Sequence, residues 1–150
     1  MQADDATYEQ RTRDSFSRQN AMQTLGATLE SVTPGRVTIA MAHRDSLTQQ
    51  HGFIHAGMLA AALDSACGYA AFSLMPADAA VLTIEFKINL LAPARGPRFR
   101  FEGVVVKPGR TISVVEGRAL QFDTDGTAEK LIATMSATVM TVRGREALKH

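Results

Sequence analysis

The chain of 150 residues has little of what several classes of protein require. It contains one cysteine, Cys67, so it cannot form an internal disulfide, and one thiol cannot build a zinc site by itself. Sixteen basic and fifteen acidic residues leave a formal net charge of +1, without the basic excess of a dedicated nucleic-acid-binding protein. No Pro-, Gly- or Ser-rich linker and no internal repeat interrupts the chain. We therefore expect one domain, residues 1–150, and no nucleic acid as partner.

Targeting and membrane-spanning segments are not expected either. The first residues are polar and carry acidic groups before any apolar run, so a cytoplasmic location is the default expectation. Residues 53–75 are long enough to cross a bilayer, but they include His55 and Asp64. An Asp in mid-span costs about 2.5–3.5 kcal/mol on insertion scales, and the few leucines here do not offset it. The segment predicts a helix buried in a protein core, and no membrane as partner.

The first 42 residues predict a helix followed by a hairpin. Apolar residues are spaced loosely at helical intervals between residues 6 and 25, which predicts a helical extension over about residues 1–25. Residues 27–32 and 36–42 read as two strands. Pro34 and Gly35 between them suit the two central positions of a type II turn. A polar connection, residues 44–52, then leads to the apolar helix.

After Pro76 the apolar pattern changes to a period of two. In residues 81–92 one predicted face carries Leu82, Ile84, Phe86, Ile88 and Leu90, and the other carries Thr83, Glu85, Lys87 and Asn89. Three further strands, at residues 98–106, 111–122 and 128–142, are separated by turn residues and predict an antiparallel meander. A helix that is apolar nearly all round has to be buried on most sides. The expected fold is α+β, with a long central helix wrapped by a curved antiparallel sheet.

Asp64 is the first candidate for chemistry. Its neighbours at helical spacing include Ala60, Ala61, Cys67 and Gly68, so its own helix offers no basic partner. One interpretation is an Asp on the exposed stripe of the helix. The other is a carboxylate that lines a cleft, with a pKa raised by poor solvation, as acid–base or nucleophilic chemistry requires.

The start of the same helix is the second candidate. Small residues at positions 52, 56 and 57 expose free backbone N–H groups, which can bind an oxygen that develops negative charge. A lone histidine such as His55 is more often a packed, hydrogen-bonded residue than a base. Although His43, His51 and His55 lie close in sequence, no known metal-binding spacing accompanies them, so we expect no metal.

The spacing of these residues resembles a known signature. Gln49-x-x-Gly52-x-x-His55-Ala56-Gly57, with Asp64 nine residues after the histidine, is similar to the pattern of hotdog-fold acyl-CoA thioesterases. The nearest resemblance is to the PaaI-like, phenylacetate-pathway branch. It continues in residues 83–89, 91–94 and 109–111 and in the last strand, and it covers most of the chain beyond about residue 20. The resemblance implies a single hotdog thioesterase domain.

The resemblance also implies a role for each matching residue. Asp64 corresponds to the nucleophile or general base, and Ala56 or Gly57 to the residue whose backbone N–H polarises the thioester carbonyl. Gln49 corresponds to an amide that positions the water or the thioester, His55 to a support of the carbonyl-binding turn, and Thr83 to a hydroxyl that holds the water. Two departures from the pattern are Ala56, where glycine is usual, and Gln49, where asparagine is commoner.

The span between the two candidates predicts a shared site. Residues 55 and 64 lie about 13 Å apart along a helix that rises ~1.5 Å per residue, so Asp64 cannot reach a carbonyl bound at the start of its own helix. We expect a homodimer with shared active sites, paired further into a homotetramer. Coenzyme A is part of the substrate, and no separate cofactor is expected. The candidates for its phosphates are Arg95, Lys107, Arg110 and Arg143.

Several functions are compatible with this pattern. The leading interpretation is hydrolysis of a small aryl-acyl-CoA or a short- or medium-chain acyl-CoA to the free acid and coenzyme A. The alternative from another class is a non-catalytic acyl-CoA-binding or regulatory module, against which the presence of Asp64 argues. A dehydratase of the same fold has no paired His and Glu to support it. The sequence leaves the acyl group open.

Overall fold

The N-terminal part consists of two short helices. A computed structural model describes residues 1–144 and 148. In it α1 spans Tyr8–Ser17 and α2 spans Asn20–Leu25, so the prediction of one continuous helix is wrong. Phe16 and Met22, both buried, are six residues apart and would point in directions about 120° apart on a single helix. The break at Gln19, which has an extended backbone, allows both side chains to face the core.

The predicted hairpin is confirmed. β1 (Thr28–Thr33) and β2 (Arg36–Ala42) pair antiparallel, and Gly35 has the positive φ of 79° that the turn requires. A short 3-10 helix, η1 (Asp45–Leu47), follows, and the chain then enters α3 (Ala56–Phe72). Most of α3 is buried, as the sequence predicts. Within the described residues, no helix is long and apolar enough to cross a membrane.

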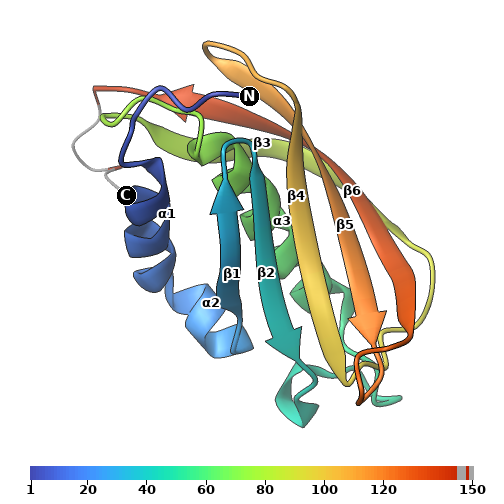
Figure 1. Ribbon diagram of the computed structural model, residues 1–150. Coiled ribbons are helices and arrows are strands. Elements are labelled where there is room, and N and C mark those ends of the chain that lie inside the picture. The colour runs from blue at the N-terminus through green and yellow to red at the C-terminus, as the bar shows by residue number, and fades with distance from the viewer. Residues whose placement is uncertain (145–147, 149–150) are drawn as a thin grey trace.

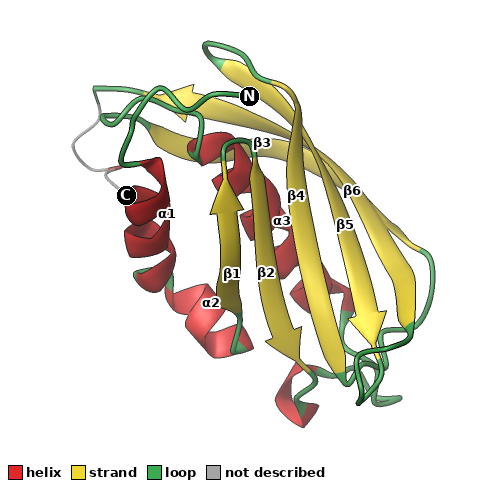
Figure 2. Cartoon of the chain, in the orientation of Figure 1, coloured by secondary structure: helices red, strands yellow, loops and turns green. Residues whose placement is uncertain are grey.

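The four remaining strands complete one six-stranded antiparallel sheet. They are β3 (Ala80–Leu90), β4 (Arg98–Lys107), β5 (Ile112–Phe122) and β6 (Glu129–Val142). The strand order is β1-β2-β4-β5-β6-β3, so β4, β5 and β6 form the predicted meander, whereas β3 lies at the edge beside β6. The sheet curves around α3, and α1 and α2 lie beside β1 (Figures 1 and 2).

A pair of glycines lets α3 approach the sheet closely. Gly103 of β4 and Gly117 of β5 are direct partners in the ladder. A Cβ atom on Gly103 would overlap the carbonyl group of Ala66, and one on Gly117 would lie 2.9 Å from the Sγ atom of Cys67. Because no side chain separates the two layers here, the middle of α3 is held directly against β4 and β5.

The faces of β3 differ from the predicted ones because the strand contains a β-bulge. Its pairing with β6 shifts register between Thr83 and Glu85. Thr83 is therefore opposite buried Val139 and faces α3, together with the side chains that follow at positions 86, 88 and 90. Leu82 lies on the outer face with Glu85, and Ile84 sits at the bulge itself. An extra residue in one strand reverses the alternation beyond it.

Candidate active site

Asp64 and Thr83 form a hydrogen-bonded pair. The Thr83 Oγ1 hydroxyl donates to Asp64 Oδ1 at 2.8 Å, and Asp64 is half-buried on the face of α3 that looks toward β3. Burial raises the pKa of Asp64 above its usual value, and the hydrogen bond from Thr83 opposes that rise. The β-bulge is what brings Thr83 to this side of the sheet. Asp64 is thus held in one orientation, in a form that takes up a proton more readily than an exposed carboxylate.

A cavity of about 440 Å³ opens next to this pair. It is bounded by α3, the start of β3 and the corner between α1 and α2. The residues that line it are Gln19, Ala21, Asp64, Ser65, Gly68, Tyr69, Val81, Leu82 and Thr83. Cys67 lies nearby but is fully buried, and burial together with the charge of Asp64 raises the pKa of its thiol to about 12. Cys67 therefore stays protonated at neutral pH and is not a nucleophile.

The start of α3 is capped by its own histidine. His55 is the N-cap residue, and its Nδ1 atom accepts a hydrogen bond from the Gly57 N–H at 2.8 Å. Its carbonyl oxygen accepts from the N–H groups of Met58 and Leu59. Of the first four N–H groups of the helix, only that of Ala56 has no hydrogen-bond partner among the described residues. Ala56, and not Gly57, therefore offers the free donor at this end.

Gln49 lies beside this free donor and is anchored to its own loop. Its Oε1 atom accepts from the backbone N–H groups of His51 and Phe53, and its backbone N–H donates to Phe53 O at 2.8 Å. Gln49 and Ala56 line one cavity of about 420 Å³, which extends to residues 90–94. Because the carbonyl end of the Gln49 amide is occupied, its NH₂ end is the part left to bind a substrate.

The structure thus brings the candidate residues together in two groups. Gln49, His55, Ala56 and Gly57 form a half-site at the N-terminus of α3, which we call the donor half-site. Asp64 and Thr83 form the second, the carboxylate half-site. Residues 56 and 64 lie about 12 Å apart along the helix axis, so one chain does not join the two groups.

The four basic candidates lie at different places. Arg110 and Arg143 line a cavity of about 290 Å³ near the C-terminal end of α3, where Arg143 Nε is 3.7 Å from Asp78 Oδ1. The guanidinium group of Arg95 lies over the ring of Phe53, 4.8 Å from its centroid, at the donor half-site. Lys107 ends β4 and is exposed. Of the four, Arg110 and Arg143 line one cavity together.

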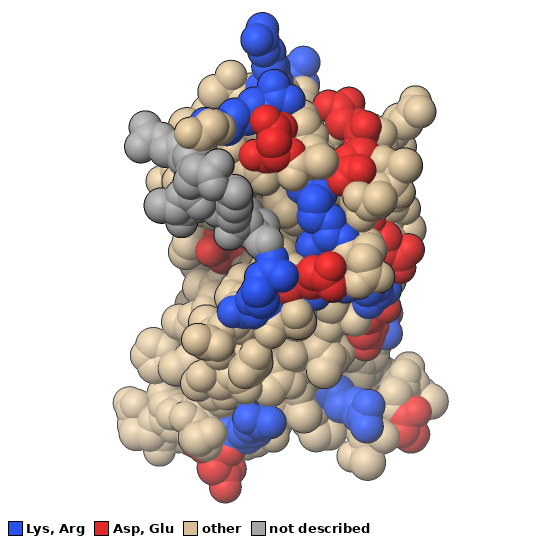
Figure 3. Space-filling view, turned by 90° about the vertical axis from the view of Figure 1, so that its left-hand side faces the viewer, with Lys and Arg blue, Asp and Glu red and all other residues tan. Residues whose placement is uncertain are grey.

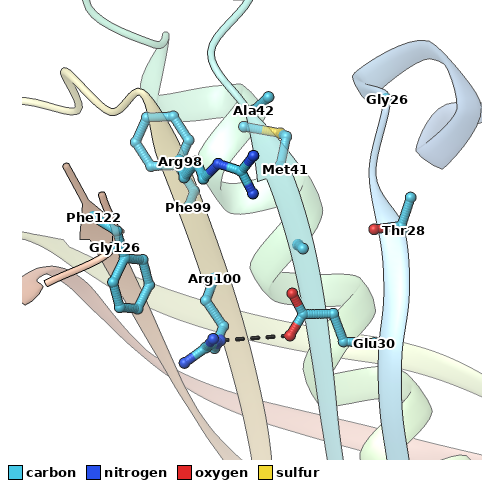
Figure 4. A pocket seen from close by; sticks show the side chains of 11 residues that line it. Gly26, Thr28, Glu30, Met41, Ala42, Arg98, Phe99, Arg100, Phe122 and Gly126 are labelled. Atoms are coloured by element: carbon cyan, nitrogen blue, oxygen red, sulfur yellow. Dashed lines mark ion pairs between the residues drawn. The ribbon is translucent and has the colours of Figure 1, made fainter. Parts of the chain in front are cut away.

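A further hollow, of about 430 Å³, lies on the outer face of the sheet (Figure 4). Arg98 and Arg100 from β4 line it opposite Glu30 of β1, and Arg100 Nε is 3.5 Å from Glu30 Oε2. Arg100 also lies over the ring of Phe122. The charge of Arg100 is therefore largely offset within the protein. On the side of the molecule that carries α1 and α2, the described residues place positive and negative side chains among one another without a continuous basic patch (Figure 3).

Two of the three predicted histidines, His43 and His55, use their rings in hydrogen bonds. His43 Nε2 is 3.0 Å from Gly52 O, and His55 caps α3. In the part of the chain that the structure describes, no three His, Cys, Asp or Glu side chains gather as a metal site would require.

Comparison with known proteins identifies the family. The model of the thioesterase superfamily matches residues 51–128, more than half of the chain. The chain belongs to this superfamily. The matched segment includes the N-terminus of α3, Asp64 and Thr83, but neither Gln49 nor the helices α1 and α2. The sequence-based prediction of a thioester-hydrolase family is confirmed.

Individual relatives support the same family and fold. A thioesterase family protein from Silicibacter pomeroyi is 57% identical, with a TM-score of 0.88 over 91% of this chain and 99% of that one. The PaaI protein of the E. coli phenylacetic acid degradation operon shares the fold, with a TM-score of 0.81 over 92% of this chain and 95% of that one at 18% identity. The chain therefore has the hotdog fold that the resemblance implies. A Saccharolobus solfataricus protein with a provisional esterase name is 36% identical over 93 residues, which are 61% of this chain and 64% of that protein. The chain thus spans less than two thirds of that relative.

One group beside the carboxylate was not foreseen from the sequence. Gln19 accepts a hydrogen bond from Ser65 Oγ at 2.8 Å and donates one to the Tyr69 hydroxyl at 3.1 Å. All three residues line the cavity next to Asp64. No sequence signal marks Gln19, because its partners lie 46 and 50 residues away.

Proposed function

We propose that the protein is an acyl-CoA thioesterase, which hydrolyses a small aryl-acyl-CoA or a short- or medium-chain acyl-CoA to the free acid and coenzyme A. The observation that carries the proposal is the half-buried Asp64, which is held by Thr83 and forms no ion pair with a basic side chain of the described residues. Its raised pKa suits a general base, which works best when its pKa lies near the working pH. Membership of the thioesterase superfamily supports the same chemistry.

The reaction needs an activated oxygen nucleophile and donors for the oxyanion. As a general base, Asp64 takes a proton from a water held by Thr83, and the water oxygen attacks the thioester carbonyl carbon. The C–S bond then breaks, and the leaving thiolate of coenzyme A receives the proton. As a nucleophile, Asp64 instead attacks the carbonyl carbon and expels the thiolate of coenzyme A, which leaves a mixed anhydride. A water molecule hydrolyses the anhydride to the free acid and the Asp64 carboxylate, and a proton of that water passes to the thiolate. In both routes the Ala56 N–H and the Gln49 amide N–H groups stabilise the carbonyl oxygen.

A two-fold dimer through β3 would complete the site. β3 is an edge strand, and its side chains Ile84, Phe86 and Leu90 are 52%, 41% and 53% exposed. Bare apolar edge strands are templates for pairing with another chain. Antiparallel pairing of two β3 strands centred on Phe86 would place Glu85 opposite the partner's Lys87. Opposite charges in such facing positions stabilise a pair of strands.

The same register would also unite the half-sites. Leu90 lines the cavity of the donor half-site, and Leu82 and Thr83 line the cavity of the carboxylate half-site. Pairing centred on Phe86 places the Leu90 end of one strand opposite the Leu82 end of the other. Each dimer would therefore contain two complete sites, with donors from one chain and Asp64 from the other. Further pairing into a tetramer stays a prediction from the family resemblance.

We assign the coenzyme phosphates to the cavity of Arg110 and Arg143. That cavity includes Ala71 on α3, about 10 Å along the helix axis from Asp64, so an extended coenzyme arm can span the distance. Arginine binds phosphate through paired N–H groups. Arg110→Gln should raise KM for acyl-CoA with little change in kcat, whereas Arg118→Gln, an exposed position on β5, should change neither.

The proposal is tested by release of free thiol from a panel of acyl-CoAs, including phenylacetyl-CoA, benzoyl-CoA and straight chains of two to twelve carbons. We expect turnover of at least one group in the panel well above the uncatalysed rate, and loss of that turnover in Asp64→Asn. A folded protein that binds acyl-CoA but releases no thiol from any member is a binding module, not a thioesterase.

The dimer is tested separately by exchanging charges. Glu85→Lys and Lys87→Glu would each place like charges opposite one another. Each should raise the dimer dissociation constant about tenfold, as measured by sedimentation equilibrium. The double variant restores the pairing and should dimerise nearly as well as the wild type. If the single variants have the wild-type dissociation constant, the proposed register of β3 is wrong.

A further inference from the structure

We propose that the corner between α1 and α2 forms a wall of the acyl-binding cavity, and that Gln19 selects acyl groups carrying a hydrogen-bonding substituent. The inference rests on the proposed function and specifies the substrate class of the same site. The corner lies before residue 51, outside the segment that the superfamily model matches. The shared part of the family would thus supply the chemistry, and the preceding segment of this chain would supply selectivity.

The cavity beside Asp64 has room for an acyl group. Its volume of about 440 Å³ lies in the range of small-molecule sites. Gly68 forms part of its lining, and a Cβ atom added at Gly68 would meet no atom within 4 Å. Ser65, Gly68 and Tyr69 lie on one face of α3, at spacings of three and four residues. Ala21, Val81 and Leu82 add apolar surface, so the walls suit a carbon chain or ring.

Gln19 introduces polarity into this lining at a fixed position. The Ser65 hydroxyl donates to Gln19 Oε1, and Gln19 Nε2 donates to the Tyr69 hydroxyl. Tyr69 is itself held by a hydrogen bond with Ser15 and by ring contacts with Phe16 and Phe72, at 5.8 and 6.0 Å between centroids. The amide is therefore held from both ends before any ligand arrives.

Part of the Gln19 amide is free for a ligand. A primary amide has two N–H donors and two oxygen lone pairs, and the contacts with described residues use one of each. The remaining N–H and lone pair can bind a hydroxyl or carbonyl group of an acyl chain in the cavity. A site built to hydrogen-bond such a group discriminates against the analogue that lacks it, because its polar atoms are then left unpaired.

A matched pair of substrates tests the selectivity. We expect the wild type to have a higher kcat/KM for 6-hydroxyhexanoyl-CoA than for hexanoyl-CoA. Gln19→Met keeps the length of the side chain and removes its hydrogen-bonding atoms. It should lower the ratio of the two kcat/KM values about tenfold, mainly through the hydroxylated substrate.

The control is Gln23→Met, the same change on the exposed face of α2. Gln23 bonds Ser17 O within the same corner and does not line the cavity, so the ratio should stay as in the wild type. An unchanged ratio in Gln19→Met overturns the inference. Equal losses on both substrates, with a lower Tm, would make Gln19 a structural brace and overturn it as well.

A variant that fills part of the cavity tests its role while Gln19 is unchanged. Gly68→Ala replaces a helical glycine where the added methyl group meets open space, so Tm should rise by about 2–3 °C. The methyl group shortens the cavity, and kcat/KM for octanoyl-CoA should fall about tenfold relative to that for butanoyl-CoA. An unchanged ratio with a raised Tm shows that the acyl group lies elsewhere. A wild type that hydrolyses no acyl-CoA overturns the proposed function and this inference together.

Discussion

The two half-sites on α3 use different kinds of chemical group. The donor half-site consists mainly of backbone: an N–H group at the first position of a helix, a histidine cap and a loop held by Gln49. The carboxylate half-site consists of side chains, Asp64 on the helix and Thr83 on a bulged strand. The first depends on where the chain turns, and the second depends on how a helix and a strand pack.

This difference explains how each half-site tolerates change. A backbone N–H group can still donate a hydrogen bond when the side chain of its residue is replaced. A carboxylate loses its ability to act as a base or nucleophile when one of its oxygens is replaced. The superfamily match covers both the start of α3 and the Asp64–Thr83 pair, and this chain carries Ala56 at a position where the family resemblance implies glycine. Substitutions that delete one donor or one acceptor at a time measure the contribution of each half-site.

The largest effect should come from Asp64→Asn. The change keeps the size of the side chain and removes the base or nucleophile, so kcat should fall by about 10²-fold or more. Because burial raises the pKa of Asp64, its ionised form is disfavoured in the folded chain, and Tm at pH 7 should not fall. Steady-state kinetics and thermal unfolding check both parts, with Asp14→Asn at an exposed position of α1 as control. Activity within a few-fold of the wild type would remove Asp64 from the mechanism.

Deleting the donor at the other half-site should cost nearly as much. Ala56→Pro removes one backbone N–H at the first position of α3, where proline suits the helix. His55 already has a ψ of 137°, within the extended range that a residue before proline adopts. We expect a folded protein whose kcat is about 10²-fold lower, as for loss of one oxyanion donor.

Mixing the two inactive variants shows whether the half-sites belong to different chains. After subunit exchange, a dimer of one Asp64→Asn chain and one Ala56→Pro chain has one intact site. An equal mixture should regain about a quarter of the wild-type activity, since half of the dimers are mixed. No recovery after verified exchange would place both half-sites in one chain.

A smaller effect is expected at Gln49. Gln49→Ala removes an amide that donates to the carbonyl and also loosens the loop before α3, so kcat should fall about tenfold with a smaller change in KM. Gln50→Ala, at the exposed neighbouring position, should leave both constants unchanged. A raised KM with unchanged kcat would mean that Gln49 binds the substrate and the transition state equally.

The smallest effect should appear as a shift in pH dependence. The hydrogen bond from Thr83 favours the ionised form of Asp64, so Thr83→Val should raise the pKa of Asp64 further. The acidic limb of the profile of kcat/KM against pH should then move to higher pH. The loss of activity should be severalfold on that limb and smaller on the plateau. A limb at the wild-type position would show that Asp64 is not the titrating group.

The sequence predicts the elements of this fold well and their faces less well. Period-two runs, turn residues and the long apolar segment predict the hairpin, α3 and all four long strands to within a few residues. The bulge in β3 is not predictable from β3 alone, since it exists only in the pairing with β6. The break at Gln19 is likewise unmarked in the local sequence, and the partners of its side chain, Ser65 and Tyr69, are distant in sequence.

The candidate site shows the same limit. Family resemblance pairs Asp64 with Thr83, and the structure supplies the distance between them and the strand that carries Thr83 inward. The sequence pattern does not show whether Ala56 or Gly57 has the free backbone N–H. That depends on which of the two N–H groups donates a hydrogen bond to the His55 ring. Spacing along a helix alone is enough to separate the two half-sites.

The two edges of the sheet differ in a way that limits how far the sheet can extend from chain to chain. β1 is six residues long and irregular, α1 lies against it, and Arg13 Nη1 donates to its Leu29 carbonyl oxygen. β3, in contrast, is eleven residues long and bare. Pairing through β3 about a two-fold axis occupies the exposed sheet edge of each chain. A third chain then has no free edge strand with which to pair. The helix beside β1 thus closes the sheet of the proposed dimer at both ends and prevents the sheet from propagating into a fibre.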